Sequence, residues 1–251
     1  MRTAIVLPAR FASVRLPGKP LLRETGKPLI QHVYEKAARA KCGGRVIVAT
    51  DDERIRAAVV AFGGEVVMTR ADHESGTDRV AEVARGLDVD VVVNLQGDEP
   101  RLPPDALDDL VGMLAANPDA DAATLMTPIR DPDTYLSPNC VKVVTDARGR
   151  ALYFSRSPIP MVRDGLPDFA AAPPLFHLHL GVYAYRRDAL LRLAATPPHP
   201  LELAEKLEQL RTLALGGSIY VASIPHAHRG VDTPADYAAF VESVRESRSP
   251  A

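Results

Sequence analysis

Short apolar runs alternate with longer amphipathic segments through the first half of the chain. The apolar runs are 4–7, 46–48, 65–68 and 91–93, and the segments of helical spacing begin near Pro28, Glu53 and Asp78. This alternation is typical of βαβ units, in which parallel strands are buried on both faces by helices. We therefore predict an α/β fold with a mostly parallel central sheet.

The second half of the chain has a less regular pattern. The apolar segments predict strands at 141–145, 151–154 and 180–185 and one helix over 201–215. Residues 161–174 are rich in Pro, Ala and Asp, which predicts an exposed loop. Thr233 and Pro234 are suited to the cap and first position of a final helix. These elements predict a smaller sheet rather than an extension of the parallel one.

Composition and charge exclude several classes of protein. The chain of 251 residues has 30 Lys+Arg and 32 Asp+Glu, a net charge of -2 that argues against general nucleic-acid binding. No apolar run approaches the roughly 20 residues that span a bilayer, and no signal-peptide pattern is present. Cys42 and Cys140 have neither metal-site spacing nor a disulfide framework. We expect no membrane span and a cytoplasmic location.

The loop after the first predicted strand concentrates positive charge. Residues 7–21 contain Arg10, Arg15 and Lys19 among three prolines and a glycine, which stiffen the backbone. Loops at the carboxyl ends of strands in such sheets are where nucleotide phosphates bind. The loop therefore predicts a phosphate site, and the alternative is an ordinary solvated basic loop.

An acidic turn follows the predicted strand at 91–93. Asp98 and Glu99 lie next to Gly97 and Pro100, so the segment could be a simple turn. Carboxylates beside a phosphate-binding loop would instead suit Mg²⁺, which takes one or two protein carboxylates and completes its shell with phosphate oxygens and water. Asp232 is a candidate second ligand, although an Asp beside Thr-Pro is by default part of a helix start.

Two further groups of polar residues are candidates for binding. In the segment 69–79, Ser75 or Thr77 could cap a helix, and small polar residues there also suit a base or ribose. Arg156 and His179 lie at the ends of predicted strands and could bind a carboxylate, which arginine does best through its fork of donors. Glu205 and Glu208, three residues apart in a predicted helix, would ordinarily form an exposed charged face.

Taken in order, these segments resemble one family over nearly the whole chain, the 3-deoxy-manno-octulosonate (Kdo) cytidylyltransferases. The matching segments are PARFASVRLPGKPL at 8–21, VATDDE at 48–53, TRADHESGTDR at 69–79, NLQGDEP at 94–100, PNCVKVV at 138–144, ALYFSR at 151–156, HLGVYAYR at 179–186, PLELAEKLEQLR at 200–211 and GVDTPAD at 230–236. The chain departs from the family pattern at Leu178, where relatives often have arginine, and in the loop 161–174. Both departures bear on the choice of sugar.

The resemblance implies a Rossmann-like nucleotide-diphospho-sugar transferase fold in one domain, 1–251. Within it, residues of about 1–130 and 225–251 would form the nucleotide-binding core, and those of about 131–224 a sugar-binding and dimerisation subregion. It also implies a cytoplasmic homodimer that uses CTP, a sugar acid and Mg²⁺.

The resemblance also implies roles for single residues. It assigns Arg10, Arg15, Lys19 and Asp98 to catalysis. The nucleotide would be bound by Arg10, Arg15, Lys19, Arg70, Asp72, Ser75 and Gly76, the metal by Asp98 and Asp232, and the sugar by Gln96, Arg156, His179, Glu208 and Gln209.

The expected reaction converts CTP and Kdo to CMP-Kdo and pyrophosphate, for lipopolysaccharide biosynthesis. Two alternatives remain open on the sequence. One is the same transfer to a related sugar acid, such as 8-amino-Kdo or a nonulosonate. The other is a nucleotide-binding regulatory protein that has lost turnover, although the presence of both candidate metal carboxylates and all three loop cations disfavours it.

Overall fold

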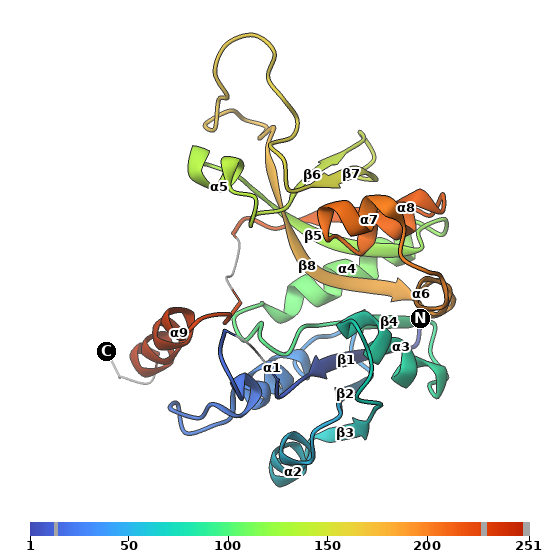
Figure 1. Cartoon of the computed structure of the whole chain (residues 1–251), viewed down its shortest axis with the longest axis vertical. Coiled ribbons are helices and arrows are strands. Elements are labelled where there is room, and N and C mark those ends of the chain that lie inside the picture. Colours follow the sequence, from blue (N-terminus) through green and yellow to red (C-terminus); the bar gives the residue numbers. More distant parts are fainter. Residues whose placement is uncertain (13–14, 227–229, 248–251) are drawn as a thin grey trace. The chain divides into compact units, whose positions relative to one another are not determined.

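The computed structural model of the chain describes residues 1–12, 15–226 and 230–247 (Figure 1). It divides into two compact units. The first unit comprises Met1–Asp108 and His228–Ala251, and the second comprises Asp109–Ala227. None of the helices in the described part of the chain is both long and apolar enough to cross a membrane. The expected division into a nucleotide-binding core and a sugar-binding subregion stays a prediction.

The first unit contains the predicted parallel sheet. Its strands β1 (Thr3–Ala9), β2 (Arg45–Thr50), β3 (Glu65–Met68) and β4 (Val91–Asn94) lie in the order β3-β2-β1-β4. All three pairings are parallel. The strands β1, β2 and β4 are apolar and buried, as expected of strands covered on both faces: Ile5, Ile47 and Val92 are fully buried. The prediction of βαβ units is confirmed.

The helices of the first unit begin where the sequence supplies caps. They are α1 (Leu29–Ala37), α2 (Glu53–Ala61), α3 (Gly76–Arg85) and α9 (Pro234–Glu246), with a short 3-10 helix, η1 (Lys19–Leu21), and the start of α4 (Pro104–Ala116). Ser75 and Thr233 each accept a hydrogen bond from the backbone three residues on and complete capping boxes. Both predicted helix starts are therefore confirmed, with Thr233 as cap and Pro234 in the first turn.

The second unit is built around a mixed sheet. Strand β5 (Ala122–Pro128) lies between β8 (His177–Arg186), which is antiparallel to it, and β9 (Ile219–Ser223), which is parallel. The strands β6 (Lys142–Thr145) and β7 (Ala151–Ser155), both predicted, form an antiparallel hairpin. The helices of this unit are α5 (Pro132–Leu136), α6 (Arg187–Ala195), α7 (Pro200–Glu205) and α8 (Gln209–Ala214).

The single helix predicted over 201–215 is wrong, because the chain breaks it at Lys206. This residue has a left-handed backbone, with φ of 54°, and separates α7 from α8. At the break, the Arg156 guanidinium donates to the backbone carbonyls of Glu205 and Lys206, which in a continuous helix would accept from the backbone amides of the next turn. Glu205 and Glu208 therefore do not share one helical face.

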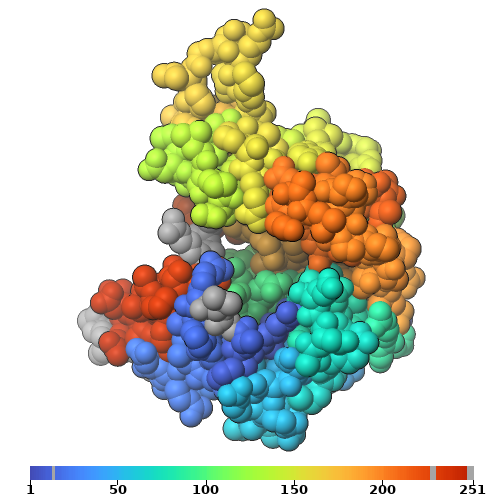
Figure 2. Space-filling model, in the orientation of Figure 1, coloured from blue at the N-terminus to red at the C-terminus, as the bar shows by residue number. Residues whose placement is uncertain are grey.

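The predicted exposed loop at 161–174 extends outward from the body of the second unit, in yellow in Figure 2. An aromatic cluster holds its base, where the Tyr135 ring lies 4.6 Å from the Phe176 ring and 5.7 Å from the Phe169 ring. Arg130 donates to the carbonyls of Phe169 and Ala171. The loop is thus attached by a small core of its own, while Leu166 is 91% exposed.

Candidate active site

A pocket of about 310 Å³ opens at the carboxyl ends of β1 and β4 in the first unit. Its walls come from the basic loop, the start of α3 and the acidic turn. The lining residues are Pro8, Ala9, Arg10, Ala12, Lys19, Pro20, Glu74, Gly76, Gln96, Gly97 and Asp98. The sheet topology produces this grouping, since parallel strands present their carboxyl ends on one edge.

The basic loop and both candidate metal ligands meet at one ammonium group. Lys19 Nζ lies 2.5 Å from Asp98 Oδ2 and 3.2 Å from Asp232 Oδ1. Its side chain is only 13% exposed, so solvent screens these contacts weakly. Two carboxylates that are far apart in the sequence are therefore within reach of a single cation. Their role as metal ligands stays a prediction.

The two arginines of the basic loop point to different neighbours. Arg15 Nη2 lies 3.1 Å from Asp232 Oδ1 and is largely exposed. Arg10 Nη2 donates to the carbonyl of His73, 2.6 Å away. Arg10 thereby fastens the basic loop to the segment 69–79, and Arg15 and Lys19 fasten it to the carboxylates.

The candidate nucleotide residues in the segment 69–79 occupy two environments. Arg70 and Asp72 form a 3.5 Å ion pair on the surface. Ser75 is occupied as the cap of α3, and its hydroxyl lies within hydrogen-bond distance of both the amide and the carboxylate of Asp78. A Cβ at Gly76 would lie 3.4 Å from Pro8 and 3.5 Å from the Gln96 amide oxygen. The start of α3 thus lies close to the end of β1.

Glu99 lies next to Asp98 in the acidic turn. Burial, together with the charges of Asp98 and Asp232, raises the pKa of Glu99 to about 8. A Cβ at Gly230 would lie 2.7 Å from Glu99 Oε1. Glycine at 230 therefore permits the segment before α9 to approach the acidic turn.

Arg79 was missed by sequence reasoning. It is fully buried, contacts Thr69, and has Nη1 3.2 Å from Asp51 Oδ1. Burial lowers the pKa of Arg79, Asp51 opposes that shift, and Arg10 adds to it. Within the described residues, its Nε and Nη2 have no hydrogen-bond partner. The signal available in the sequence was the placement of Asp51 and Thr69 directly after β2 and β3.

In the second unit, Arg156 is held mainly by backbone carbonyls. Its Nε donates to Glu205 over 2.6 Å and its Nη1 to Pro138 over 2.9 Å. Its backbone amide donates to the Glu205 carboxylate. The guanidinium therefore organises the end of α7, in addition to any role with a ligand.

The sequence predicted His179 at the end of a strand. In the structure, His179 lies within β8. Its Nε2 lies 2.9 Å from Thr124 Oγ1, and its ring packs 4.9 Å from Phe154. Burial lowers the pKa of His179 to about 3, so the ring is neutral near pH 7. A neutral imidazole can orient a polar ligand by hydrogen bonding, but it does not supply a positive charge.

The other candidate sugar residues are divided between the units. Gln209 is buried at the start of α8, and among the described residues its Nε2 has no partner. Glu208 precedes Gln209 in the chain. Burial of Tyr183 raises the pKa of its hydroxyl well above the usual value, and the charge of Glu208 raises it further. Gln96 belongs to the first unit, where its amide nitrogen donates to Asn94 Oδ1 over 3.1 Å.

Lys142 is a second buried cation that the sequence did not reveal. Its Nζ donates to the backbone carbonyls of Ser137, Cys140 and Arg156 at 2.8, 2.5 and 2.6 Å. Burial lowers its pKa. Backbone carbonyls therefore accept all three hydrogen bonds of the Lys142 ammonium group. These bonds tie the segment before β6 to Arg156.

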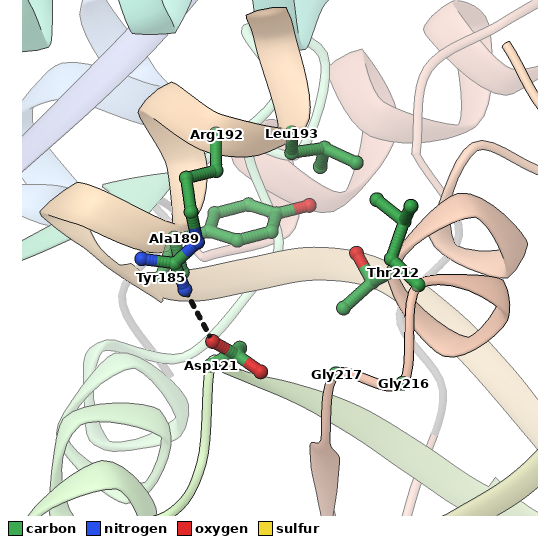
Figure 3. Close-up of a pocket in the computed structure, with 9 residues that line it drawn as sticks. Asp121, Tyr185, Ala189, Arg192, Leu193, Thr212, Gly216 and Gly217 are labelled. Atoms are coloured by element: carbon green, nitrogen blue, oxygen red, sulfur yellow. Dashed lines mark hydrogen bonds and ion pairs between the residues drawn. The ribbon is translucent and has the colours of Figure 1, made fainter. Parts of the chain in front are cut away.

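A separate pocket of about 210 Å³ lies among β8, α6 and α8 in the second unit (Figure 3). Arg192 Nη2 and Asp121 Oδ1 lie 2.8 Å apart at its edge, where Figure 3 marks the contact. Their charges offset each other, and much of the remaining wall is apolar or glycine. This pocket holds none of the candidate site residues.

Known proteins similar to this chain are cytidylyltransferases. The family described as "Cytidylyltransferase" matches residues 4–221. A 3-deoxy-manno-octulosonate cytidylyltransferase of Geobacter sulfurreducens is 51% identical over 98% of this chain and 100% of its own length. Another, of Syntrophobacter fumaroxidans, is 53% identical over 96% of both.

A solved structure described as CMP:2-keto-3-deoxy-manno-octonic acid synthetase complexed with CTP has a TM-score of 0.91 and 44% identity. The match covers 98% of this chain and 100% of that chain, which confirms the predicted fold class. The chain belongs to the 3-deoxy-manno-octulosonate cytidylyltransferase family.

Proposed function

We propose that this chain is a nucleotidyltransferase that converts CTP and Kdo to CMP-Kdo and pyrophosphate, the step that activates Kdo for lipopolysaccharide biosynthesis. The observation that carries the proposal is the meeting of Lys19, Asp98 and Asp232 at the strand-end pocket of a chain that belongs to this family. A basic loop beside two carboxylates is the arrangement that a metal-bound triphosphate requires.

In the proposed reaction, the anomeric hydroxyl of Kdo attacks the α-phosphorus of CTP. A new phosphorus–oxygen bond forms, the bond from the α-phosphorus to the bridging oxygen breaks, and pyrophosphate leaves with that electron pair. The hydroxyl proton passes to solvent or to a nearby base. The protein contributes mainly by positioning and by stabilising charge on phosphate oxygens, without a covalent protein intermediate.

Arg10, Arg15 and Lys19 would hold the triphosphate. Each contacts an oxygen atom of the chain itself, the His73 carbonyl for Arg10 and carboxylates for the other two. Phosphate oxygens offer the same donors a more highly charged acceptor, so the nucleotide would take over these contacts. Lys19 is more buried than Arg15, the other cation that contacts a carboxylate. Lys19 would therefore supply a preorganised charge.

The residues present suit a divalent cation. Asp98 and Asp232 both contact Lys19 Nζ, so an oxygen of each already lies beside one positive charge. Among the described residues, no group of three or more His, Cys, Asp or Glu side chains could hold a metal alone. Two carboxylates plus phosphate oxygens are the usual Mg²⁺ shell. When bound, Mg²⁺ would offset charge on the phosphates and favour ionisation of the attacking hydroxyl.

The base and ribose would lie against the segment 69–79. The candidate contacts are Arg70, Asp72, Ser75 and Gly76, and Gly76 lies close to the end of β1. The sugar acid would be bound by Gln96, Arg156, His179, Glu208 and Gln209. Gln209 Nε2, which has no partner among the described residues, supports this assignment, because a buried donor without a partner is costly unless a ligand satisfies it.

The proposed assembly is a cytoplasmic homodimer that uses the second unit. Most of the described large apolar side chains that are exposed belong to that unit: Leu136, Leu152, Met161, Leu166, Leu175, Leu201, Leu203 and Leu215. A twofold pairing of identical surfaces is the commonest closed arrangement and would remove such side chains from water.

Product identification tests the proposed function. The purified chain with CTP, Kdo and Mg²⁺ is expected to yield one product whose phosphorus resonance is that of a phosphodiester and whose mass is that of CMP-Kdo. Omission of Kdo should leave CTP intact. If the chain bound CTP but formed no phosphodiester with any sugar acid, the reading as a non-catalytic nucleotide-binding protein would replace this one.

A further inference from the structure

A second polar pocket, of about 270 Å³, lies in the first unit between α1 and α9. The segment just after the acidic turn closes it. Its lining residues are His32, Glu35, Lys36, Arg39, Pro100, Arg101, Phe240, Ser243, Val244 and Ser247. None of them lines the pocket at the ends of β1 and β4.

Three cations line this second polar pocket: Lys36 from α1, Arg39 from the turn after α1, and Arg101 from the segment before α4. Over residues 1–12, 15–226 and 230–247, no ion pair joins any of them to a carboxylate. The one carboxylate in the lining, Glu35, is occupied by Lys27 at 2.7 Å and by the Gln31 amide at 2.8 Å. The pocket therefore has an excess of positive charge.

The three cations are close enough to affect one another. Burial lowers the pKa of Lys36, and the charges of Arg39 and Arg101 lower it further. Like charges that repel one another in a partly desolvated hollow are stabilised when an anion enters. The repulsion is a cost of the empty pocket that a bound anion would relieve.

An aromatic wall orients one of these cations. The guanidinium of Arg101 lies over the Phe240 ring, with its Cζ 5.8 Å from the ring centroid. The His32 ring meets the same phenyl group edge-on at 5.1 Å. Phe240 is itself buried in a cluster with Leu29 and Val241, so the wall is fixed. Contact of this kind holds the planar fork of an arginine ready for a tetrahedral oxyanion.

We propose that this second polar pocket binds a phosphoryl anion, of the size of inorganic phosphate or pyrophosphate. Two guanidinium groups and one ammonium suit an anion with several charged oxygens. The pocket, of about 270 Å³, has room for an ion of this size. The chain's net charge of -2 argues against general nucleic-acid binding. The proposal does not depend on the activity of the chain, because the active-site pocket shares none of these residues.

Calorimetric titration with phosphate and with pyrophosphate, without metal and at fixed ionic strength, tests the proposal. The protein used is the full chain carrying Lys19→Ala, so that the basic loop contributes less. In this background, Arg39→Ala or Lys36→Gln is expected to weaken binding by about tenfold or more, the loss of one charged contact. Lys41→Ala is the matched control, because Lys41 is an exposed cation near the same helix, 4.0 Å from Asp105.

The two titrants distinguish the sources of the anion, because the anion with the lower dissociation constant is the better ligand. Citrate serves as a polycarboxylate probe. Equal binding of citrate and pyrophosphate would overturn the phosphoryl class. The proposal would also be overturned if the Lys19→Ala chain bound neither anion, or if Arg39→Ala and Lys36→Gln bound as tightly as Lys41→Ala. Arg39 is exposed, so its replacement should leave the fold intact, which circular dichroism can verify.

Discussion

Lys19 and Asp98 form an ion pair of 2.5 Å although 79 residues separate them in the chain. Lys19 begins the 3-10 helix at the end of the basic loop, and Asp98 lies in the turn after β4. The pair links the two segments in which the sequence predicted phosphate and metal binding. Because the same ammonium also contacts Asp232, a metal ion bound there would compete with Lys19 for carboxylate oxygens. Nucleotide and metal should therefore bind together, with Lys19 turning to the phosphates.

Asp98→Asn should nearly abolish pyrophosphate release while the fold survives. A neutral amide is a much poorer ligand for Mg²⁺ than a carboxylate and cannot balance the charge of Lys19. The measurement is the turnover rate across a range of Mg²⁺ concentrations, with Asp105→Asn, an exposed residue of the same unit, as control. Full activity of Asp98→Asn at ordinary Mg²⁺ concentrations would remove Asp98 from the metal site.

Lys19→Ala should lower kcat by about 10²–10³-fold, the cost of removing one preorganised charge from the transition state. Steady-state kinetics with varied CTP separates kcat from KM, and Lys27→Ala, which removes a surface cation, should behave like the wild type. A change confined to the KM for CTP would mean that Lys19 binds substrate and transition state equally.

Arg211→Ala should destabilise the fold by about 3–5 kcal/mol, because it removes the cation that balances the buried Glu202 carboxylate. Arg211 contacts both oxygens of Glu202, at 2.5 and 2.7 Å, and its side chain is 9% exposed. Denaturant unfolding measures the loss. The control is Arg192→Ala, which breaks a 2.8 Å pair whose arginine is 66% exposed and should cost at most about 1 kcal/mol. Similar losses in the two variants would contradict the burial argument.

His179→Gln should make the fold more resistant to acid. The folded pKa of about 3 lies below the ordinary 6.5, so between these values the unfolded chain binds a proton that the folded chain excludes. The wild type should therefore lose stability relative to His179→Gln as the pH falls below 6.5, by up to about 1.4 kcal/mol per pH unit.

Unfolding curves between pH 7 and pH 4 measure this difference. Glutamine can keep a hydrogen bond with Thr124, and the exposed His226→Gln is the control for loss of a histidine. Parallel pH profiles for wild type and His179→Gln would show that the buried ring is protonated in the folded state.

The parts of the fold that the sequence predicted are those determined locally. The strands β1, β2 and β4 are continuous apolar runs, and such runs have few alternatives to a buried parallel sheet. The starts of α3 and α9 followed from Ser75 and Thr233, whose side chains satisfy backbone amides within three residues. The approach of Asp98 to the basic loop followed from topology, since both come after the carboxyl ends of adjacent parallel strands.

The parts that sequence reasoning missed depend on partners distant in the chain. The residues around Lys206 have ordinary helical patterning, yet the helix breaks there, where Arg156, 50 residues away, donates to the Lys206 carbonyl. Arg79 looks like an exposed residue of an amphipathic helix, yet Asp51 and Thr69 draw it into the interior. Lys142 lies in an apolar run and is tolerated only because three carbonyls converge on it. Periodicity cannot reveal a buried charge whose compensation is tertiary.

The most direct test of the central claim is the rate of pyrophosphate release with each of the four nucleoside triphosphates, in the presence of Mg²⁺ and of Kdo, 8-amino-Kdo or a nonulosonate. The proposed function predicts rapid release with CTP and Kdo, much slower release with ATP, GTP or UTP, and none without a sugar acid. Faster release with 8-amino-Kdo or a nonulosonate would keep the nucleotidyl transfer but contradict Kdo as the substrate. No release above background with any pair would contradict the assignment of Lys19, Asp98 and Asp232 to a working transferase.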